Sequence, residues 1–386
     1  MYQLPFPFQI LAWVILPLGL LPALWLFLLT LAGLFPRRKV PSGEAPKRIA
    51  LVIPAHNEAL LIQPTVTGAL AQNYPRDHFT VLVIADNCKD ATAQLARDAG
   101  ARVHERHDNP GKGQALAEVF TNLMAEDWDA VMVVDADTEM DPTVLQSVSD
   151  RLNQGADALQ VHYGVQNPAE SRRTMVMEMA LASFNGLRPR GKAALGLSAG
   201  IFGNGFCLSR NTLQQVPYRA GSIVEDLEYH LELVAAGLKV HFLDEVRVIA
   251  QMPATAADSD SQRVRWERGR MNMIRTLVPK LLGSMLRGKR GSLEALIDVC
   301  MPPVSAVCLS LGAAFVLGDT LVRLLALAAL VLTVMHYTLA SARYGNLRRM
   351  ARVMAYVPYY FLWKTWAVCR SLLSRAGLGW VRTKRH

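Results

Sequence analysis

Three long uncharged runs interrupt an otherwise mixed pattern of hydrophobic and polar positions. The first 36 residues carry no charged side chain, and Ile10–Phe35 is an uncharged run of 26 residues. As a helix it would be about 39 Å long, enough to span a bilayer with some tilt. Arg37, Arg38 and Lys39 follow directly, and such charges mark the cytoplasmic end of a span. We predict a signal anchor with its N-terminus outside, in preference to a cleaved signal peptide, because no basic segment precedes the run and no small-residue cleavage site follows it.

The other two runs form a pair. Val299–Leu317 and Leu324–Ala342 each contain 19 uncharged residues, and the short link Gly318–Arg323 separates them. The pair predicts a transmembrane hairpin. The alternative is a buried helical hairpin within a soluble core.

A fourth segment, Met354–Leu373, is rich in Tyr and Trp but contains Lys364 and Arg370. A charge near the bilayer centre costs ~2.5–3.5 kcal/mol on insertion scales. Spanning would also carry the basic tail Arg382–Arg385 outside, against the charge rule. An interfacial helix is the better interpretation.

Between the anchor and the hairpin, short apolar runs alternate with helical patterns. The predicted strands are Ile49–Ile53, Thr80–Ala85, Ala101–His104 and Ala130–Val134, and the predicted helices are Ala59–Ala71, Ala91–Ala99 and Gln114–Met124. This alternation is typical of βαβ units, so we expect an α/β fold whose parallel sheet is covered by helices on both faces.

Polar residues follow these strands where each strand ends. They are His56, Glu58, Asp86, Asp135 and Asp137, and Pro54 lies just before the first of them. Because the carboxyl ends of parallel strands meet at one edge, where open α/β sheets bind ligands, we expect a nucleotide pocket there.

The pair Asp135 and Asp137 is the most informative of these features. Two carboxylates two residues apart in extended backbone point to the same side. Paired hard oxygen ligands beside a nucleotide suit Mg²⁺ or Mn²⁺. The alternative is an ordinary acidic turn after a strand.

Three further features are candidates for substrate contacts. Lys112 lies in a predicted flexible loop, 109–113, where its ammonium either reaches a phosphate or base or is simply solvated. Ser222–Glu225 fits a helix capping box, which leaves the next residue, Asp226, as a candidate general base. Gln262–Trp266 has two interpretations. Arg265 clamps a diphosphate while Trp266 faces a sugar ring, or the segment is a plain basic surface.

The charge distribution points to a membrane rather than to nucleic acid. The formal net charge is +9, and residues 263–386 hold 20 Lys and Arg against 4 Asp and Glu. These basic residues flank the apolar runs, which fits an anionic membrane surface, so we expect membrane lipid and no nucleic acid as a partner. The five cysteines form no C-x-x-C pair, which suits reduced thiols in a cytoplasmic domain.

Taken together, the motifs resemble those of membrane-bound family-2 glycosyltransferases of the GT-A fold. This group includes cellulose, chitin, hyaluronan and poly-N-acetylglucosamine synthases and ceramide glucosyltransferase. Its pattern D…DxD…ED…QxxRW is matched in order by Asp86, Asp135–Asp137, Glu225–Asp226 and Gln262–Trp266. The resemblance covers roughly residues 48–280.

The resemblance implies a role for each matched residue. Lys112, which lies outside the four motifs, and Glu225 complete the expected substrate-binding set. By the resemblance, Pro54, His56, Glu58 and Asp86 would line the nucleotide pocket, Asp135 would lie beside the donor sugar and diphosphate, and Asp137 would bind the metal. Asp226 would be the general base, and Gln262, Arg265 and Trp266 would hold the diphosphate and acceptor. It also implies an inverting single displacement, usually from a UDP-sugar. Polymer synthases that extrude their product usually have more than three membrane helices, so a polymer product would call for a secretion or assembly partner.

The expected protein is thus a Rossmann-like nucleotide-diphospho-sugar transferase domain with flanking transmembrane helices in the inner (cytoplasmic) membrane. The expected parts are an anchor at 1–36, a linker at 37–47, a cytoplasmic catalytic domain at 48–280, a hairpin with a preceding interfacial segment at 281–343, and a basic interfacial helix with a cytoplasmic tail at 344–386. A lipid, a lipid-linked sugar or a polysaccharide remains open as the acceptor. The rival functions are a nucleotidyltransferase, which residues 262–266 argue against, and a non-catalytic sugar-nucleotide sensor or scaffold, which the full set of acids argues against.

Overall fold

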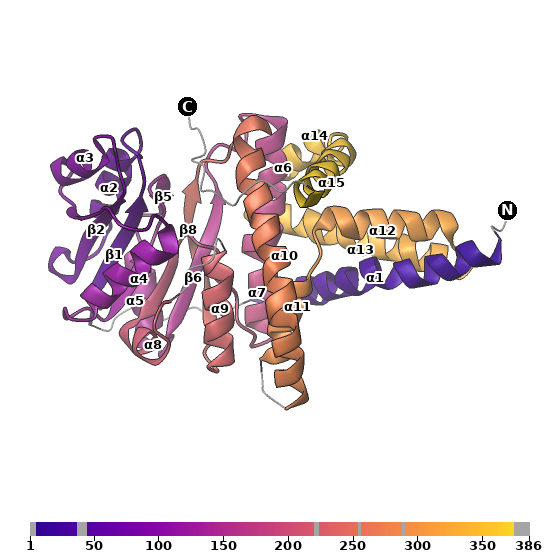
Figure 1. Ribbon diagram of the computed structural model, residues 1–386, viewed down its shortest axis with the longest axis horizontal. Helices are drawn as coiled ribbons and strands as arrows, with labels where there is room; N and C mark the ends of the chain where they lie inside the picture. The colour runs from indigo at the N-terminus through magenta and orange to yellow at the C-terminus, as the bar shows by residue number, and fades with distance from the viewer. Residues whose placement is uncertain (1–4, 37–44, 220–223, 254–255, 288–290, 374–386) are drawn as a thin grey trace.

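A computed structural model describes residues 5–36, 45–219, 224–253, 256–287 and 291–373 of the chain. An α/β domain lies at one end of the molecule, and a group of apolar helices projects from the other end (Figure 1). Most of the predicted linker, the basic cluster at 37–39, Ser222 and the basic tail lie outside the described residues.

The α/β domain is built on one eight-stranded sheet with the order β3-β2-β1-β4-β7-β6-β8-β5. The strands are β1 Ile49–Ala55, β2 Phe79–Asp86, β3 Arg102–Arg106, β4 Ala130–Val133, β5 Thr138–Met140, β6 Ala158–Val165, β7 Phe206–Ser209 and β8 Val240–Ala250. Strands β1 to β4 are parallel, and β6 pairs parallel with β8. β7 runs antiparallel to β4 and β6, and β5 runs antiparallel to β8. The sheet is therefore mixed, and the prediction of a purely parallel sheet is right only for its first half.

Helices cover both faces of the sheet, as predicted. The helices of this domain are α2 Ile62–Leu70, η1 Arg76–His78, α3 Thr92–Asp98, α4 Lys112–Leu123, α5 Val144–Asn153, α8 Arg210–Gln215 and α9 Glu225–Ala235. Alternate residues of β1 point into separate cores: Leu51 packs with α2, α3 and α5, and Val52 packs with α4, α8 and α9. This two-sided burial explains the continuous apolar runs of the central strands.

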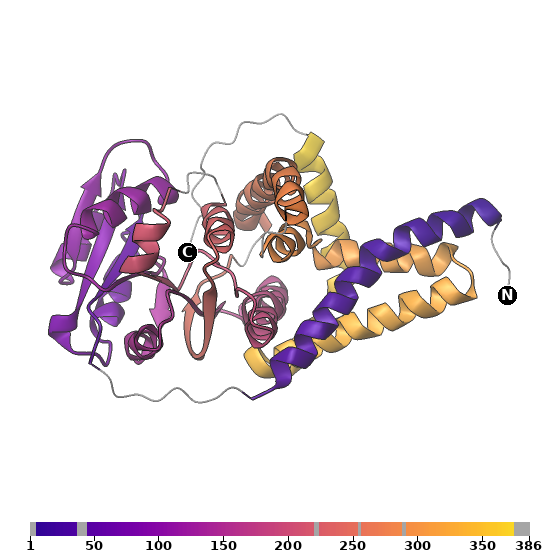
Figure 2. The same cartoon turned by 90° about the horizontal axis from the view of Figure 1, so that it is seen from below.

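The apolar helices at the other end include two that are long enough to cross a membrane. α1 Phe6–Leu34 and α13 Thr320–Tyr344 meet that test on length and composition. They pack against each other and against α12 Val304–Leu317 (Figure 2). The first predicted run and the third are thus confirmed as helices of spanning length.

The second predicted run is not one helix. The chain breaks after α11 Ser292–Cys300, and α12 leaves at 76° to it, so the pair is either a broken span or a re-entrant segment. Pro302 and Pro303 cause the break, since proline lacks the amide hydrogen and restricts the residue before it. α12 alone has 14 residues, about 21 Å, which is shorter than a hydrocarbon core of about 30 Å.

Helices at the junction join the two ends of the molecule. They are α6 Arg172–Leu181, the π-helix η2 Ala182–Leu187, α7 Arg188–Ala194, α10 Ala256–Leu286, α14 Leu347–Val353 and α15 Val357–Leu373. Arg190 of α7 donates to the carbonyls of Gly33 and Phe35 at 3.1 and 2.8 Å, and to the Asp244 carboxylate of β8 at 2.9 and 3.0 Å. This buried guanidinium ties the end of α1 to the sheet. α15 is not among the candidate spans of the described chain, and its start packs on α6.

Candidate active site

The Lys112 ammonium is the centre of a polar cluster at the carboxyl edge of the sheet. It lies 2.5 Å from a carboxylate oxygen of Asp135 and 2.6 Å from the carbonyl oxygen of Gly203. A Cβ added to Gly203 would lie 3.4 Å from Oδ2 of Asp226, so the acid at the start of α9 borders the same group. The fold thus brings together predicted residues from α4, the turn after β4, and α9.

Lys112 was expected in a flexible loop, but it is the first residue of α4. Gly111, with φ +153°, donates its amide to Asp86 at 2.9 Å and precedes the helix directly. The helix start therefore fixes the lysine backbone beside the acids, and the solvated-loop alternative is wrong.

The charges of this cluster are unbalanced. Burial, together with the nearby Asp226 carboxylate, raises the pKa of Glu225 to about 7. Burial also raises the pKa of Asp226. Burial alone would lower the pKa of Lys112, but the carboxylates of Asp135, Glu225 and Asp226 raise it overall. One ammonium faces three acids, so the cluster favours an additional cation.

Asp86 has a different environment from these acids. It forms a buried ion pair with Arg106 of β3 at 2.8 Å, and its second oxygen accepts the Gly111 amide. Arg106 also binds Glu118 of α4 at 2.8 Å. Asp86 therefore holds the segment between β3 and α4 in place.

The residues after β1 lie beside Asp86. The Nδ1 atom of His56 lies 2.6 Å from the Asp86 carbonyl oxygen, and because a carbonyl only accepts, Nδ1 carries the proton. The backbone amide of Glu58 donates to the Thr92 hydroxyl at 2.8 Å, and Pro54 lies within β1 opposite Ile84. The strand ends thus meet at one edge, as expected.

The D-x-D motif lies in a turn, not in extended backbone. β4 ends at Val133, and the amide of Thr138 donates to the carbonyl of Asp135 at 3.1 Å to close the turn that leads into β5. The argument that both carboxylates share one side of a strand is therefore wrong. Asn204 accepts the Asp135 amide at 3.1 Å, and Asp137 is buried.

The donor set suits a divalent ion only in part. Among the described residues, no group of three or more His, Cys, Asp or Glu is arranged to hold a metal. However, Mg²⁺ is usually bound by one or two carboxylates together with substrate phosphates. A turn with two aspartates beside an acid-rich cluster fits that mode, and Asp137 as the metal ligand stays a prediction.

The start of α9 corrects the capping-box prediction. The helix begins at Glu225 with Val224 as its N-cap, and no side chain of the described residues caps it. Glu225 is therefore the first helical residue rather than the third. Its place in the first turn, with Asp226 and Glu228, suits the positive end of the helix dipole.

The fourth motif lies on α10, which runs between the sheet and the apolar helices (Figure 1). The side chains of Gln262, Arg265 and Trp266 lie outside the described residues. The helix itself is close to the cluster, because a Cβ added to Gly269 would lie 2.9 Å from Val224. Trp266 is one helical turn before Gly269 on the same helix.

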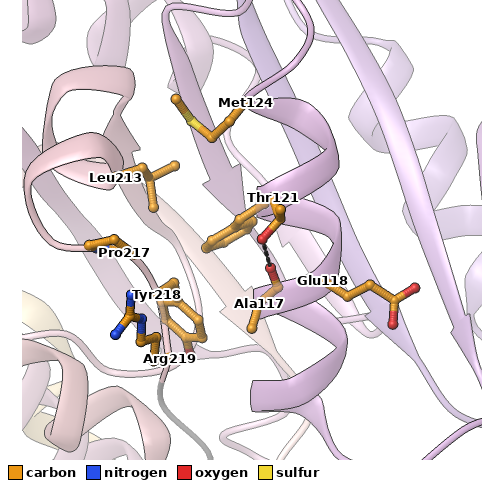
Figure 3. Close-up of a pocket in the computed structure, with 9 residues that line it drawn as sticks. Ala117, Glu118, Thr121, Met124, Leu213, Pro217, Tyr218 and Arg219 are labelled. Carbon is orange, nitrogen blue, oxygen red and sulfur yellow. Dashed lines mark hydrogen bonds between the residues drawn. The ribbon is translucent and has the colours of Figure 1, made fainter.

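A cavity of about 430 Å³ lies on the flank of α4, and its lining does not include Lys112, Asp135 or Asp226. Figure 3 shows Tyr218 and Leu213 facing α4 across it, while Glu118 points away. The Tyr218 ring packs on Phe120 and Tyr229, at 5.1 and 4.6 Å between ring centroids. Tyr218 therefore packs between α4 and α9.

Sequence reasoning missed Arg106 and the loop that closes the cluster. Arg106 lies two residues beyond the predicted third strand. It becomes a neighbour of Asp86 only because β2 pairs with β3. The loop is segment 200–205, whose glycines are evident in the sequence. Gly203 and Gly205 adopt positive φ, so the glycines themselves were the signal that could have revealed the loop. Such glycines let the backbone approach Lys112 and Asp226 closely.

Comparisons with known proteins fit this architecture. The model of the family described as "Glycosyltransferase like family 2" matches residues 46–269. A probable glycosyltransferase, YdaM, of Bacillus subtilis is 25% identical over 248 residues, which cover 62% of this chain and 59% of that protein. Glucomannan 4-beta-mannosyltransferase 7 of Arabidopsis thaliana is 23% identical over 268 residues, covering 66% and 48%. The chain thus spans between about half and three fifths of these relatives.

A solved structure extends the likeness to the whole fold. A mannosyltransferase from Pyrobaculum calidifontis, in complex with GDP-Man and Mn²⁺, superposes with a TM-score of 0.58 at 16% identity. The match covers 96% of this chain and all of that one. The domain has the GT-A fold with flanking apolar helices, as the sequence predicted. Because the family model matches more than half of the chain, the protein belongs to glycosyltransferase family 2.

Proposed function

We propose that the protein is a metal-dependent, inverting glycosyltransferase that moves a hexosyl or N-acetylhexosaminyl group from a nucleotide sugar, with UDP as the first expected carrier. The observation that carries the proposal is the convergence of Lys112, Asp135 and Asp226 at the carboxyl edge of the sheet. This edge is where α/β sheets bind nucleotides.

Asp226 is the proposed general base. Its raised pKa, caused first by burial, brings it closer to the neutral range in which a base is effective. The Asp226 carboxylate would take the proton of the acceptor hydroxyl as the sugar is attacked. Lys112 would stay charged among the acids and orient Asp135 beside the donor.

The remaining roles follow the family motifs. His56, Glu58 and Asp86 would form the nucleotide side of the pocket with Pro54, and Asp137 would hold Mg²⁺ or Mn²⁺. The ion supplies stabilisation of the negative charge on the leaving diphosphate. Gln262, Arg265 and Trp266 would close the site from α10, with Glu225 at the acceptor side.

The apolar helices support a site of action at a membrane. α1, α13 and the bent pair α11–α12 would hold residues 48–280 at the cytoplasmic face of the inner membrane. A lipid, lipid-linked or polysaccharide acceptor fits this position.

The test is a donor panel given to the purified protein with membrane lipid extract. UDP- and GDP-sugars are incubated with Mn²⁺, with Mg²⁺ or with excess EDTA. The released nucleotide is measured by chromatography and the product by mass spectrometry. Nucleoside diphosphate release that stops with EDTA supports the proposal. Pyrophosphate release would indicate nucleotidyl transfer, and full turnover in EDTA would refute metal dependence.

A further inference from the structure

A second polar cavity lies far along the sheet from the α4 flank, at the junction with the apolar helices. It has a volume of about 250 Å³ and is lined by β6, the end of α6, the start of η2, β8, the end of α13 and α14. Its polar walls include His162, Gln166, Glu178, Arg247, Tyr344 and Arg349. None of these residues belongs to the proposed catalytic set.

His162 is the residue that marks the cavity as a binding site. It is 7% exposed, and its ring packs against that of Tyr344 at an angle of 45°, with 4.9 Å between the ring centroids. Within the described part of the chain its ring nitrogens make no hydrogen bond. Burial lowers its pKa to about 4, so at neutral pH the ring offers one donor and one acceptor to a ligand. The ring nitrogens are not among the fully buried unpaired polar atoms of the described residues, so they are accessible from the cavity and can bind a ligand there.

The arginines give the cavity its preference for an anion. Arg349 is held by Glu178, with nitrogen–oxygen distances of 2.7 and 2.5 Å, so these two charges cancel. Arg247 is 62% exposed, and its contact to Asp141 is long, at 3.7 Å. Arg247 is therefore available to a ligand, and guanidinium groups match phosphate oxygens in geometry.

The cavity lies at the end of a helix of spanning length. α13, one of the two helices of spanning length, ends at Tyr344, which lines the cavity. The adjoining α14 and α15 expose Leu347, Tyr359 and Trp366. Exposed tyrosine and tryptophan beside the end of a span are typical of the membrane–water interface.

We propose that this cavity binds the phosphate of an anionic phospholipid headgroup, held by Arg247 and His162. Bound there, the headgroup joins the end of α13 to strands β6 and β8 and fixes the soluble domain against the membrane. The proposal stands apart from the catalytic site and does not require the chain to transfer a sugar.

The test uses the full chain in a neutral detergent and follows its Tm. The ligands are dihexanoyl phosphatidylglycerol, dihexanoyl phosphatidylcholine and glycerol phosphate. The variants are Arg247→Gln and His162→Phe, which keeps an aromatic ring against Tyr344. Arg348→Gln is the matched control, because Arg348 is exposed on α14 and does not line the cavity.

We expect a saturable rise in Tm with phosphatidylglycerol, and little with phosphatidylcholine. Arg247→Gln and His162→Phe should weaken the apparent Kd about tenfold or more, and Arg348→Gln by less than about twofold. An equal loss in Arg348→Gln, or an equal response to phosphatidylcholine, would overturn the proposal. Glycerol phosphate binding as tightly as the lipid would keep the phosphate site but overturn its assignment to lipid. If His162→Phe fails to fold without ligand, the exposed Arg247→Gln decides the outcome.

Discussion

At the scale of single residues, the candidate active site is a cluster of unbalanced charges around Lys112. Its ammonium contacts Asp135 directly and lies among Glu225 and Asp226 as well. A cluster with more acids than bases is expensive to bury unless a cation or a proton joins it. The raised pKa of Glu225 records this cost.

Glu225→Gln should therefore stabilise the protein at high pH. Folding raises the Glu225 pKa from 4.5 to about 7, so the folded state binds a proton that the unfolded chain has released. Stability must fall as the pH rises through this window, and above it the variant should recover on the order of 2 kcal/mol. Thermal unfolding at pH 5 and pH 8, without divalent metal, measures the difference from wild type.

The matched control is Glu228→Gln, which removes the same charge from the same helical turn. The wild type and the control should both lose stability between pH 5 and pH 8 more steeply than Glu225→Gln. If stability falls with pH as steeply in Glu225→Gln as in the wild type, the Glu225 carboxylate is not the buried charge that destabilises the fold. A stability loss at both pH values would instead restore the capping role.

At the scale of elements, the close crossing of α1 and α7 joins the two ends of the molecule. A Cβ added to Gly191 would lie 2.1 Å from the carbonyl oxygen of Leu29, which no rotamer change relieves. Gly191→Ala should therefore push the helices apart and destabilise the protein by about 1–3 kcal/mol. Gly312→Ala is the control, since nothing lies within 4 Å of its added Cβ and alanine favours a helix by ~1 kcal/mol.

Melting temperatures of the two variants in detergent check this prediction. Gly191→Ala should melt below wild type and Gly312→Ala at or above it. Equal melting temperatures would mean that α1 does not pack against α7 as described.

The elements that the sequence predicts well are those whose signal is local. β1, β2 and β4 are largely apolar runs, and α1 and α13 contain long uncharged ones. Each can therefore be predicted from its own residues, without knowing which elements it packs against. β7 is four residues long and is a strand because β4 and β6 flank it. The bend before α12 follows from Pro302 and Pro303, a local signal that the hydropathy pattern alone overlooks.

In the candidate active site, too, some residues are predictable from local sequence and others depend on long-range pairing. His56, Asp86 and Asp135 follow visible strands, so their convergence at one edge is predictable. The turn that contains Asp137 and the loop that contains Gly203 are set by long-range pairing, including Asn204 with Asp135. Arg106 forms an ion pair with Asp86 only because β2 and β3 are neighbours in the sheet.

At the scale of the whole molecule, the apolar helices and the charge distribution predict one topology. The end of α13 and the basic residues Arg348 and Arg349 should be cytoplasmic. Reporter fusions after Leu347 and after His386 should both give cytoplasmic signals, and one at Asp319, between α12 and α13, should give an outside signal if α11–α12 crosses. An outside signal after His386 would mean that α15 spans.

The most direct test of the account is the effect of Asp226→Asn on turnover and on donor binding in the same preparation. Asparagine keeps the size of the side chain and can still accept the Leu227 amide, which Asp226 binds at 2.8 Å. It cannot accept the acceptor proton, so turnover should fall by about 10²–10⁴-fold while the donor Kd stays nearly unchanged. Near-normal turnover, or a loss of donor binding in proportion to the loss of rate, would contradict Asp226 as the base.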